Sequence, residues 1–252
     1  MSNLYWLSEE QMARLQPFFP KSHGRPRVDD RRVLSGIIFF NRNGLRWCDA
    51  PKEYDPPKTL YNRWKRWSEM GVFARIFEGL AAEAAEPTTI MIDATYLKAH
   101  RTASSLRAKK GGFERLVGRT KGGMNTKLHA VTDTSGRPIR FFMSAGQISD
   151  YTGAAALLDD LPTADWLLAD RGYDADWFRN ALRDKGIKPC IPGRKARKIP
   201  IKYDKRRYKR RNRIEIMFGR LKDWRRVATR YDRCPKVFLS AIALAATVLF
   251  WL

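Results

Sequence analysis

Residues 204–226 read DKRRYKRRNRIEIMFGRLKDWRR, a stretch that predicts one amphipathic helix with Asp204 as its N-cap. An α-helix has 3.6 residues per turn, so the key polar residues of this stretch share an arc of roughly 60°. They are Tyr208, Arg211, Glu215 and Lys222. The apolar residues on the opposite side are Ile214, Met217, Leu221 and Trp224. The pattern predicts a helix that buries one face and presents a single carboxylate among cations on the other. A surface helix with an ordinary Arg211–Glu215 ion pair is the simpler alternative.

The charge of the chain is large and uneven. The 252 residues carry a net charge of +23, and residues 1–88 hold only 14 Lys and Arg against 11 Asp and Glu. Most of the excess therefore lies after residue 88, where it repels itself unless an anion offsets it. We expect nucleic acid to be that anion. Residues 194–213 carry twelve Lys and Arg, and we expect them to follow the DNA backbone, with a merely solvated surface as the alternative.

Other partners and compartments fit the composition less well. No basic segment has the clean apolar face of a membrane-surface helix. The apolar residues 237–252 are fewer than the roughly 20 that span a bilayer, so we expect a buried helix there and no membrane partner. Three Cys and three His without metal-ligand spacing argue against a disulfide framework or a zinc site. We expect a cytoplasmic, nucleoid-associated protein.

The periodicity changes at residues 86–87, which we interpret as a domain boundary. Helices are predicted over residues 4–19, 28–43, 58–70 and 72–85, and they indicate an all-helical domain over residues 1–87. A short helix, a turn and a basic helix favour a helix-turn-helix-like DNA-binding module. A bundle that only supports dimerisation or the second domain is nearly as good an interpretation.

Residues 88–252 show strands alternating with helices. Strands are predicted over residues 88–98, 126–132, 138–144, 166–169 and 187–191, and helices over 150–161 and 176–185, besides the helix of residues 204–226. Residues 101–123 are predicted to form a long basic loop. A hairpin followed by crossovers predicts an α/β domain, a mixed sheet flanked by helices.

Two acids follow apolar strands in this second part of the chain. Asp93 comes after residues 90–92, and Asp170 comes after residues 166–169. If the two strands are neighbours, both carboxylates reach one edge of the sheet, and Glu215 could join them there. Carboxylates held together repel one another, so a divalent cation is expected, and oxygen ligands favour Mg²⁺ or Mn²⁺ over zinc. Two such ions can drive phosphodiester chemistry. Either Asp alone would be read as a strand-end turn residue.

The joint pattern resembles the bacterial insertion-sequence transposases of the Asp-Asp-Glu class, in the IS-four/IS-five superfamily. Their signature is Tyr, two residues, Arg, three residues, Glu, six residues and Lys, which this sequence matches at residues 208, 211, 215 and 222. The first acid matches in Ile92-Asp93-Ala94-Thr95, the second matches in residues 169–173, and residues 28–57 resemble the helical N-terminal region. The resemblance covers nearly the whole chain. The chain lacks the large β insertion that some relatives carry before the Glu, which argues against their hairpin-based cleavage route.

The resemblance implies an RNase H-like catalytic domain over residues 88–252 that cleaves DNA at insertion-sequence ends and joins the 3′-hydroxyl to target DNA. Asp93, Asp170 and Glu215 would be the catalytic and metal-binding residues, with Mg²⁺ as cofactor and Mn²⁺ as its substitute. The candidate DNA-binding residues are Tyr208, Arg211, Lys222, Arg207, Arg210 and Arg171. A homodimer or larger assembly on DNA is expected. Two alternatives remain: a two-metal nuclease that does not join DNA, and a catalytically silent DNA-binding protein derived from a transposase.

Overall fold

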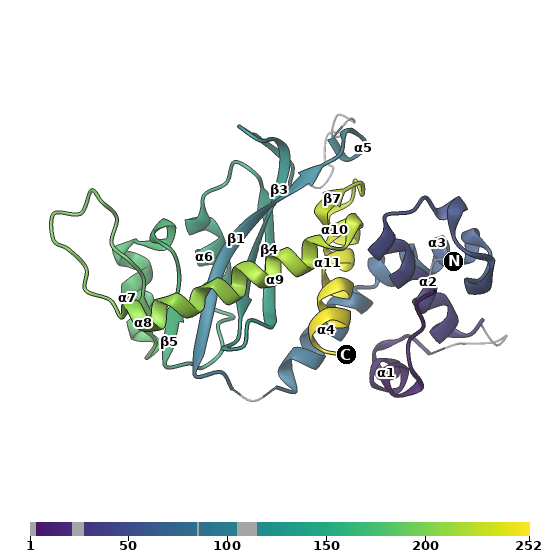
Figure 1. The fold of residues 1–252 in the computed structure, drawn as a ribbon, viewed down its shortest axis with the longest axis horizontal. Helices are drawn as coiled ribbons and strands as arrows, with labels where there is room; N and C mark the ends of the chain where they lie inside the picture. Colours follow the sequence, from purple (N-terminus) through teal and green to yellow (C-terminus); the bar gives the residue numbers. More distant parts are fainter. Residues whose placement is uncertain (1–3, 22–27, 85, 105–114) are drawn as a thin grey trace. The chain divides into compact units, whose positions relative to one another are not determined.

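A computed structural model describes residues 4–21, 28–84, 86–104 and 115–252 (Figure 1). The chain forms two compact units that interleave along the sequence. Unit 1 comprises residues 1–80, 100–105 and 221–252, and unit 2 comprises residues 81–99 and 106–220. The chain first passes from unit 1 to unit 2 after residue 80, close to the expected boundary at residue 87. Residues 221–252, however, belong to unit 1 and not to the second part of the chain. That the two parts divide DNA binding from catalysis stays a prediction.

Unit 1 is built almost wholly from helices, which confirms the predicted helical N-terminal region. Its elements are α1 (Glu9–Leu15), η1 (Gln16–Phe18), α2 (Asp30–Asn43), η2 (Trp47–Asp49), η3 (Lys52–Tyr54), α3 (Pro57–Glu69), α4 (Val72–Ala82, which runs into unit 2), α5 (Arg101–Ser104), α10 (Arg225–Ala228), β7 (Thr229–Arg230) and α11 (Pro235–Phe250). The first helix is shorter than the predicted 4–19. Ser8 caps it by accepting the N–H of Gln11 at 3.1 Å, so the chain before Ser8 is extended.

The apolar C-terminal stretch forms the buried helix that the sequence predicts. Helix α11 packs against α2 and α3, and most of its side chains are shielded from water. This packing places the end of the chain in unit 1, because the apolar surface of α11 is covered there. Among the described residues, no helix combines the length and the apolar content that crossing a bilayer requires.

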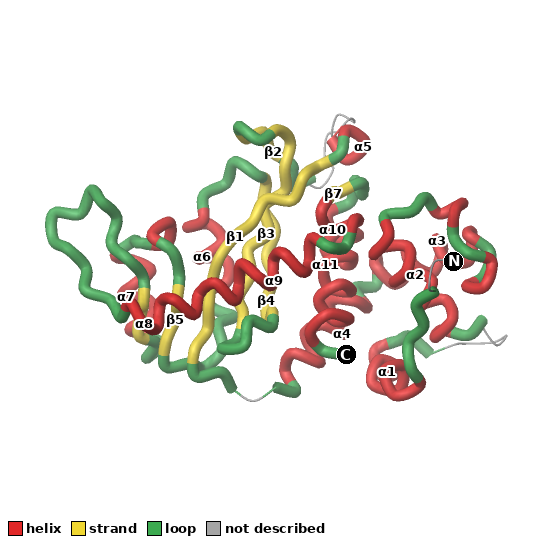
Figure 2. The backbone as a smooth tube through the Cα atoms, viewed as in Figure 1, coloured by secondary structure: helices red, strands yellow, loops and turns green. Residues whose placement is uncertain are grey.

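Unit 2 contains the predicted mixed sheet flanked by helices (Figure 2). Its strands are β1 (Thr89–Ala99), β2 (Gly118–Thr120), β3 (Gly123–Thr132), β4 (Pro138–Ala145), β5 (Trp166–Leu168) and β6 (Lys188–Cys190). Strand β3 is antiparallel to β2, β4 and β1, whereas β5 is parallel to β1 and to β6. Residues 105–114 of the predicted 101–123 loop lie outside the described residues.

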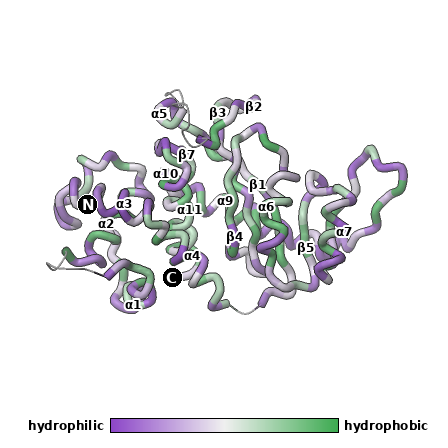
Figure 3. The backbone as a smooth tube through the Cα atoms, turned by 180° about the vertical axis from the view of Figure 1, so that it is seen from behind, coloured by the Kyte–Doolittle hydropathy of each residue, from purple (hydrophilic) through white to green (hydrophobic). Residues whose placement is uncertain are grey.

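The helices of unit 2 cover both faces of the sheet. They are α6 (Asp150–Leu158), η4 (Arg171–Tyr173), α7 (Asp176–Asp184), α8 (Lys205–Tyr208), η5 (Lys209–Arg211) and α9 (Asn212–Lys222), whose last two residues belong to unit 1. His129 of β3 faces α6, because a Cβ added at Gly153 would lie 2.0 Å from its Nδ1. Asp93 is paired with Ala130, the next residue of β3, so it points to the other face. Helix α9 crosses that face (Figure 1), and hydrophobic residues concentrate on the strands around β1 (Figure 3).

The stretch of residues 204–226 is not the single helix that its periodicity predicts. It is divided into α8, the 3₁₀ turn η5, α9 and α10, with a break at residues 223–224. Asp204 is the N-cap, as predicted, and accepts the N–H of Arg207 at 2.8 Å. The apolar face is buried as predicted, including Ile214, Met217, Leu221 and Trp224. The prediction of one helix was wrong because residues 209–211 tighten into a 3₁₀ turn and residues 223–224 break the helix, neither of which the periodicity reveals.

Candidate active site

Two neighbouring strands bring the first two acids to the same level of the sheet. Strands β1 and β5 are parallel, with Ile90 opposite Leu167 and Met91 opposite Leu168. Asp93 and Asp170 each lie two residues beyond the last of these pairs, and the negative charge of Asp170 is near enough to raise the pKa of Asp93. Neighbouring strands lie about 4.8 Å apart, so the two residues are close although 76 positions separate them in the sequence.

The two acids differ in their backbone setting. Asp93 follows the apolar residues 90–92, and β1 continues beyond it to Ala99, close to the end of the strand predicted over residues 88–98, because β3 pairs with it as far as Lys98. Asp93 is therefore in mid-strand, at the point where parallel pairing with β5 has stopped. Asp170 follows β5 and caps the turn η4, with its Oδ1 accepting the N–H of Gly172 at 2.7 Å. This bond fixes the Asp170 carboxylate in place.

Arg211 joins the first acid to the third. Its Nη1 lies 3.2 Å from Oδ2 of Asp93 and 2.9 Å from Oε1 of Glu215. One nitrogen thus contacts both oxygens, so Oδ2 of Asp93 and Oε1 of Glu215 lie near each other. Burial raises the pKa of Asp93 to about 6; Arg211 opposes this rise, while the negative charges of Asp170 and Glu215 add to it. Asp93 is thus a poorly solvated carboxylate, and its ionised form needs a positive neighbour.

The oxygen-only donor set fits a hard divalent cation. Among the described residues, no three His, Cys, Asp or Glu side chains are grouped tightly enough to hold a metal ion alone. Mg²⁺, however, is usually bound by one or two carboxylates, with substrate phosphates and water as the remaining ligands. The guanidinium of Arg211 already lies as a cation between Asp93 and Glu215. That the three acids bind metal together stays a prediction.

The candidate DNA-binding residues are not all in one place. The Tyr208 ring lies 6.0 Å from the Arg211 guanidinium, so the polar face of the helix persists across η5. Arg207 instead covers the ring of Trp166 at 4.4 Å. The exposed candidates on unit 2 are Arg171 and Arg210. Lys222 is two turns beyond Glu215 on α9 but belongs to unit 1, and burial lowers its pKa.

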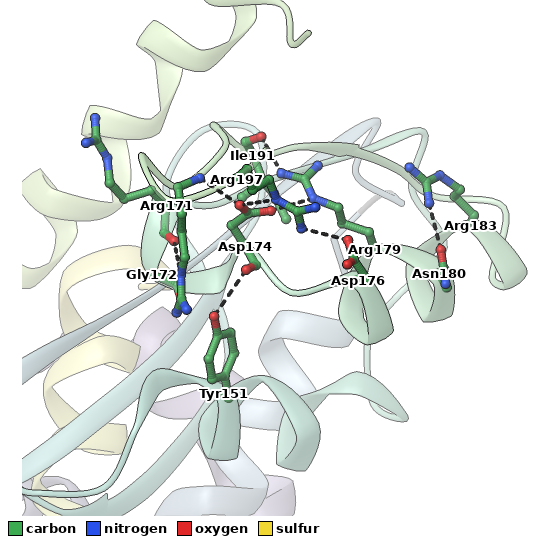
Figure 4. A network of polar contacts seen from close by, with 11 residues as sticks. Tyr151, Arg171, Gly172, Asp174, Asp176, Arg179, Asn180, Arg183, Ile191 and Arg197 are labelled. Atoms are coloured by element: carbon green, nitrogen blue, oxygen red, sulfur yellow. Dashed lines mark hydrogen bonds and ion pairs between the residues drawn. The ribbon is translucent and has the colours of Figure 1, made fainter. Parts of the chain in front are cut away.

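A buried ionic network beside Asp170 was not expected from the sequence (Figure 4). Its centre is Asp174, whose side chain has no exposed surface. Arg179 donates to its Oδ1 at 2.8 Å, and Arg197 donates to its Oδ2 at 2.6 Å. The backbone N–H of Arg194 also donates to Oδ2, at 2.7 Å. The network ties the basic segment that begins at Arg194 to the turn that carries Asp170. Sequence reasoning missed it because the partners are up to 23 residues apart.

Two more groups near Asp170 escaped the sequence analysis. The sequence places Asp150 only at the start of the helix predicted over residues 150–161, and Tyr173 only within the matched residues 169–173, with no role for either. In the structure, Asp150 pairs with the buried Lys127 at 3.1 Å, and the hydroxyl of Tyr173 is buried without a hydrogen-bond partner among the described residues. An acid in the first turn of a helix carries no sequence signal that separates an ordinary helix-terminal residue from a site residue.

Comparison with known proteins adds independent information. The chain is 36% identical over 131 residues to "Putative transposase for insertion sequence element IS6501" of Brucella ovis, covering 51% of this chain and 99% of that protein. It is 27% identical over 181 residues to "Putative transposase for insertion sequence element IS402" of Burkholderia cepacia, covering 59% and 83% of the two chains.

A solved structure shares the fold. The cryo-EM structure of a piggyBac transposase synaptic complex with hairpin DNA aligns with a TM-score of 0.53 at 8% identity, over 94% of this chain and 68% of that one. With the strand order of unit 2, this likeness confirms the predicted RNase H-like fold.

Two family models match successive parts of the sequence. Residues 7–77 match the family described as "Putative transposase of IS4/5 family", and residues 84–250 match "Transposase DDE domain". Because the second match covers well over half of the chain, and because the relatives are insertion-sequence transposases by description, this protein belongs to the DDE transposase family, in its IS4/5 branch.

Proposed function

We propose that the chain binds the ends of an insertion sequence, cleaves DNA there and joins the resulting 3′-hydroxyl to target DNA. The observation that carries this proposal is the parallel pairing of β1 with β5, since Asp93 and Asp170 each follow the last paired residues by two positions. Arg211 then links Asp93 to Glu215 from the facing helix. An acid pair and a third acid beside it, in a family of DNA-processing enzymes, support phosphoryl transfer.

In this proposal each residue of the site has a distinct task. Asp93, Asp170 and Glu215 would hold Mg²⁺ or Mn²⁺, and two such ions, when bound, would activate the attacking hydroxyl and stabilise the leaving oxygen. The hydrogen bond from Gly172 keeps the Asp170 carboxylate oriented. Arg211 can bind a phosphate through two parallel N–H donors, and Tyr208 can donate a hydrogen bond to one.

Double-stranded DNA is the proposed partner. The net charge of +23 supplies the attraction, and the segment from Arg194 to Arg213 supplies a dense row of cations. The likeness to a transposase that is solved as a synaptic complex with DNA supports the same proposal. Residues 1–87 would form the DNA-binding part, residues 88–252 would form the catalytic part, and a homodimer or larger assembly would hold two ends.

A strand-transfer assay separates this function from its alternatives. Labelled duplexes of the element's own terminus are given in two forms, uncut and pre-cut with a free 3′-hydroxyl, together with a target plasmid and Mg²⁺ or Mn²⁺. The wild-type chain should cut the first and join the second to the plasmid. Cutting without joining would indicate the non-joining nuclease, and binding with neither reaction would indicate a silent DNA-binding protein.

Removing Arg211 or Lys222 should weaken binding to the terminal duplex and flatten its salt dependence. Each phosphate contact that is lost reduces the slope of log K against log salt by about 1, because fewer counterions are released on binding. Binding is measured from 50 to 200 mM salt without divalent ions, for Arg211→Ala and Lys222→Ala. Lys185 is exposed, and Lys185→Ala removes one positive charge in the same way, so this variant serves as the control. An unchanged slope would show that the two residues act within the fold and not on DNA.

A further inference from the structure

A fourth carboxylate lies beside Asp170. Asp150 is the first residue of α6, and the turn η4 packs against that helix. A Cβ built at Gly172 would lie 2.8 Å from Oδ1 of Asp170 and 3.4 Å from Oδ2 of Asp150. Two anionic oxygens therefore converge on one point, and they can do so because residue 172 has no side chain.

Among the described residues, Lys127 holds Asp150 by one carboxylate oxygen, and the other oxygen lies near Gly172. Nζ of Lys127 donates to Oδ1 of Asp150 at 3.1 Å and to the carbonyl of Ile148 at 2.6 Å. The Lys127 side chain is only 7% exposed, and its Nζ lies 5.0 Å from the centre of the Tyr96 ring. Oδ2, the oxygen near Gly172, is on the side of Asp170. The Asp150 side chain is 35% exposed, so an ion can reach it from solvent.

Tyr173 provides a second, independent observation that points to a ligand at this place. Its side chain is fully buried, and its hydroxyl has no hydrogen-bond partner among the described residues. Burial raises the pKa of this hydroxyl, and the charges of Asp150, Asp93 and Asp170 raise it further, so the group lies among these acids as a neutral donor. A buried donor without an acceptor is costly, and native structures rarely keep one without a use.

We propose that Asp150 and Asp170 together bind a divalent cation, and that the Tyr173 hydroxyl donates to a water or phosphate oxygen held at that position. This inference rests on the proposed phosphoryl-transfer function and adds a residue to it. Mg²⁺ and Mn²⁺ suit such a place, because two carboxylates with water and substrate phosphate form an ordinary ligand set for a hard ion. Lys127 acts as a positioning residue, since it reaches the ion only through Asp150.

Mn²⁺ binding to the DNA-free full-length chain tests the proposal without any measure of activity. Free Mn²⁺ is followed by electron paramagnetic resonance during titration of the wild type and of Asp150→Asn. Asp150→Asn should raise the Kd at least about tenfold, because removing even an outer-shell partner of a metal ligand typically weakens metal binding by about that much. Asp160→Asn, an exposed acid just beyond the end of α6, is the matched control and should leave the Kd unchanged. Asp150→Glu keeps the charge and should restore part of the affinity.

Tyr173→Phe keeps the proposal testable if Asp150→Asn fails to fold. The phenylalanine removes only a hydroxyl that has no protein partner, so its melting temperature should be equal to or above that of the wild type. If the hydroxyl serves the ion, Mn²⁺ affinity should nevertheless fall. Wild-type affinity in a folded Asp150→Asn, or in Tyr173→Phe where the first variant is unfolded, would overturn the inference.

Asp170→Asn distinguishes failure of this inference from failure of the proposed function. If Asp170→Asn loses Mn²⁺ binding while Asp150→Asn keeps it, the acid pair Asp93 and Asp170 stands and the role of Asp150 is refuted. If Asp170→Asn also binds Mn²⁺ as the wild type does, the proposed metal chemistry itself is refuted.

Discussion

Glu215→Gln and Asp93→Asn should each abolish strand cleavage while DNA binding persists. The amides keep the shape of the side chains but lack the negative charge that would hold a cation. A metal ion contributes several kcal/mol to the transition state of phosphoryl transfer, and each 1.4 kcal/mol is a factor of ten, so we expect a loss of about 10³-fold or more. Initial rates of nicking on a terminal duplex in Mg²⁺ measure it.

The structure provides reasons to expect a loss of chemistry and not of folding. Glu215 is 60% exposed, so Gln in its place disturbs no core. Asn at position 93 can still accept the hydrogen bond from Arg211. Asp159→Asn, an exposed acid at the end of α6, is the control for charge, and gel shifts without Mg²⁺ check binding. Cleavage at the wild-type rate by either variant would remove that residue from the active site.

Asp174→Asn should cost more stability than any other single change considered for this chain. The side chain is fully buried and accepts hydrogen bonds from Arg179, Arg197 and the N–H of Arg194. Removing one partner of a buried ionic group leaves the other charges uncompensated, which costs roughly 3–5 kcal/mol. Urea unfolding of the full chain measures the loss. Cleavage at a temperature where the variant is still folded should also fall, because the turn with Asp170 is tied to this network.

Asp176→Asn is the matched control for burial. Asp176 also pairs with Arg197, at 2.7 Å, but its side chain is 76% exposed. Exposed pairs contribute only about 0–1 kcal/mol, so this variant should unfold close to the wild type. Equal losses for the two substitutions would show that burial does not set the strength of this network.

The stability that Asp174 contributes depends on pH, and the direction of this dependence follows from the pKa shift of the Asp174 carboxyl. Burial by itself would raise the pKa of Asp174, but the hydrogen bonds from Arg197, Arg194 and Arg179 outweigh burial and lower it. A lowered carboxyl pKa stabilises the fold above the unfolded value of about 3.9, and that stability is lost as the pH falls below it. The difference in unfolding free energy between wild type and Asp174→Asn should therefore be full at pH 7 and shrink below about pH 4.

Local pattern in the sequence determined the secondary structure well. Strands β1, β3, β4, β5 and β6 and the helices α2, α3, α6, α7 and α11 lie within a few residues of their predicted positions, whereas β2 lies within the predicted loop of residues 101–123. The spacing of apolar residues is a local property: every second residue in a strand and every third or fourth residue in a helix face the core. This spacing is the same whichever partner the element packs against. The apolar face around Ile214 and Met217 was readable for the same reason. The three acids were identifiable because their spacing matches a family signature.

Only the tertiary structure decided how these parts meet. The pairing of β1 with β5, which brings Asp93 near Asp170, depends on hydrogen bonds between strands that are far apart in the sequence. The packing of α11 in unit 1 depends on which apolar surface covers it. Asp150 and Asp174 gained their partners by the same long-range folding, because a charge in sequence does not reveal which cation the fold brings to it. The sequence by itself thus determined the elements and the reactive groups, whereas the sheet register and the buried ion pairs determined where those groups stand.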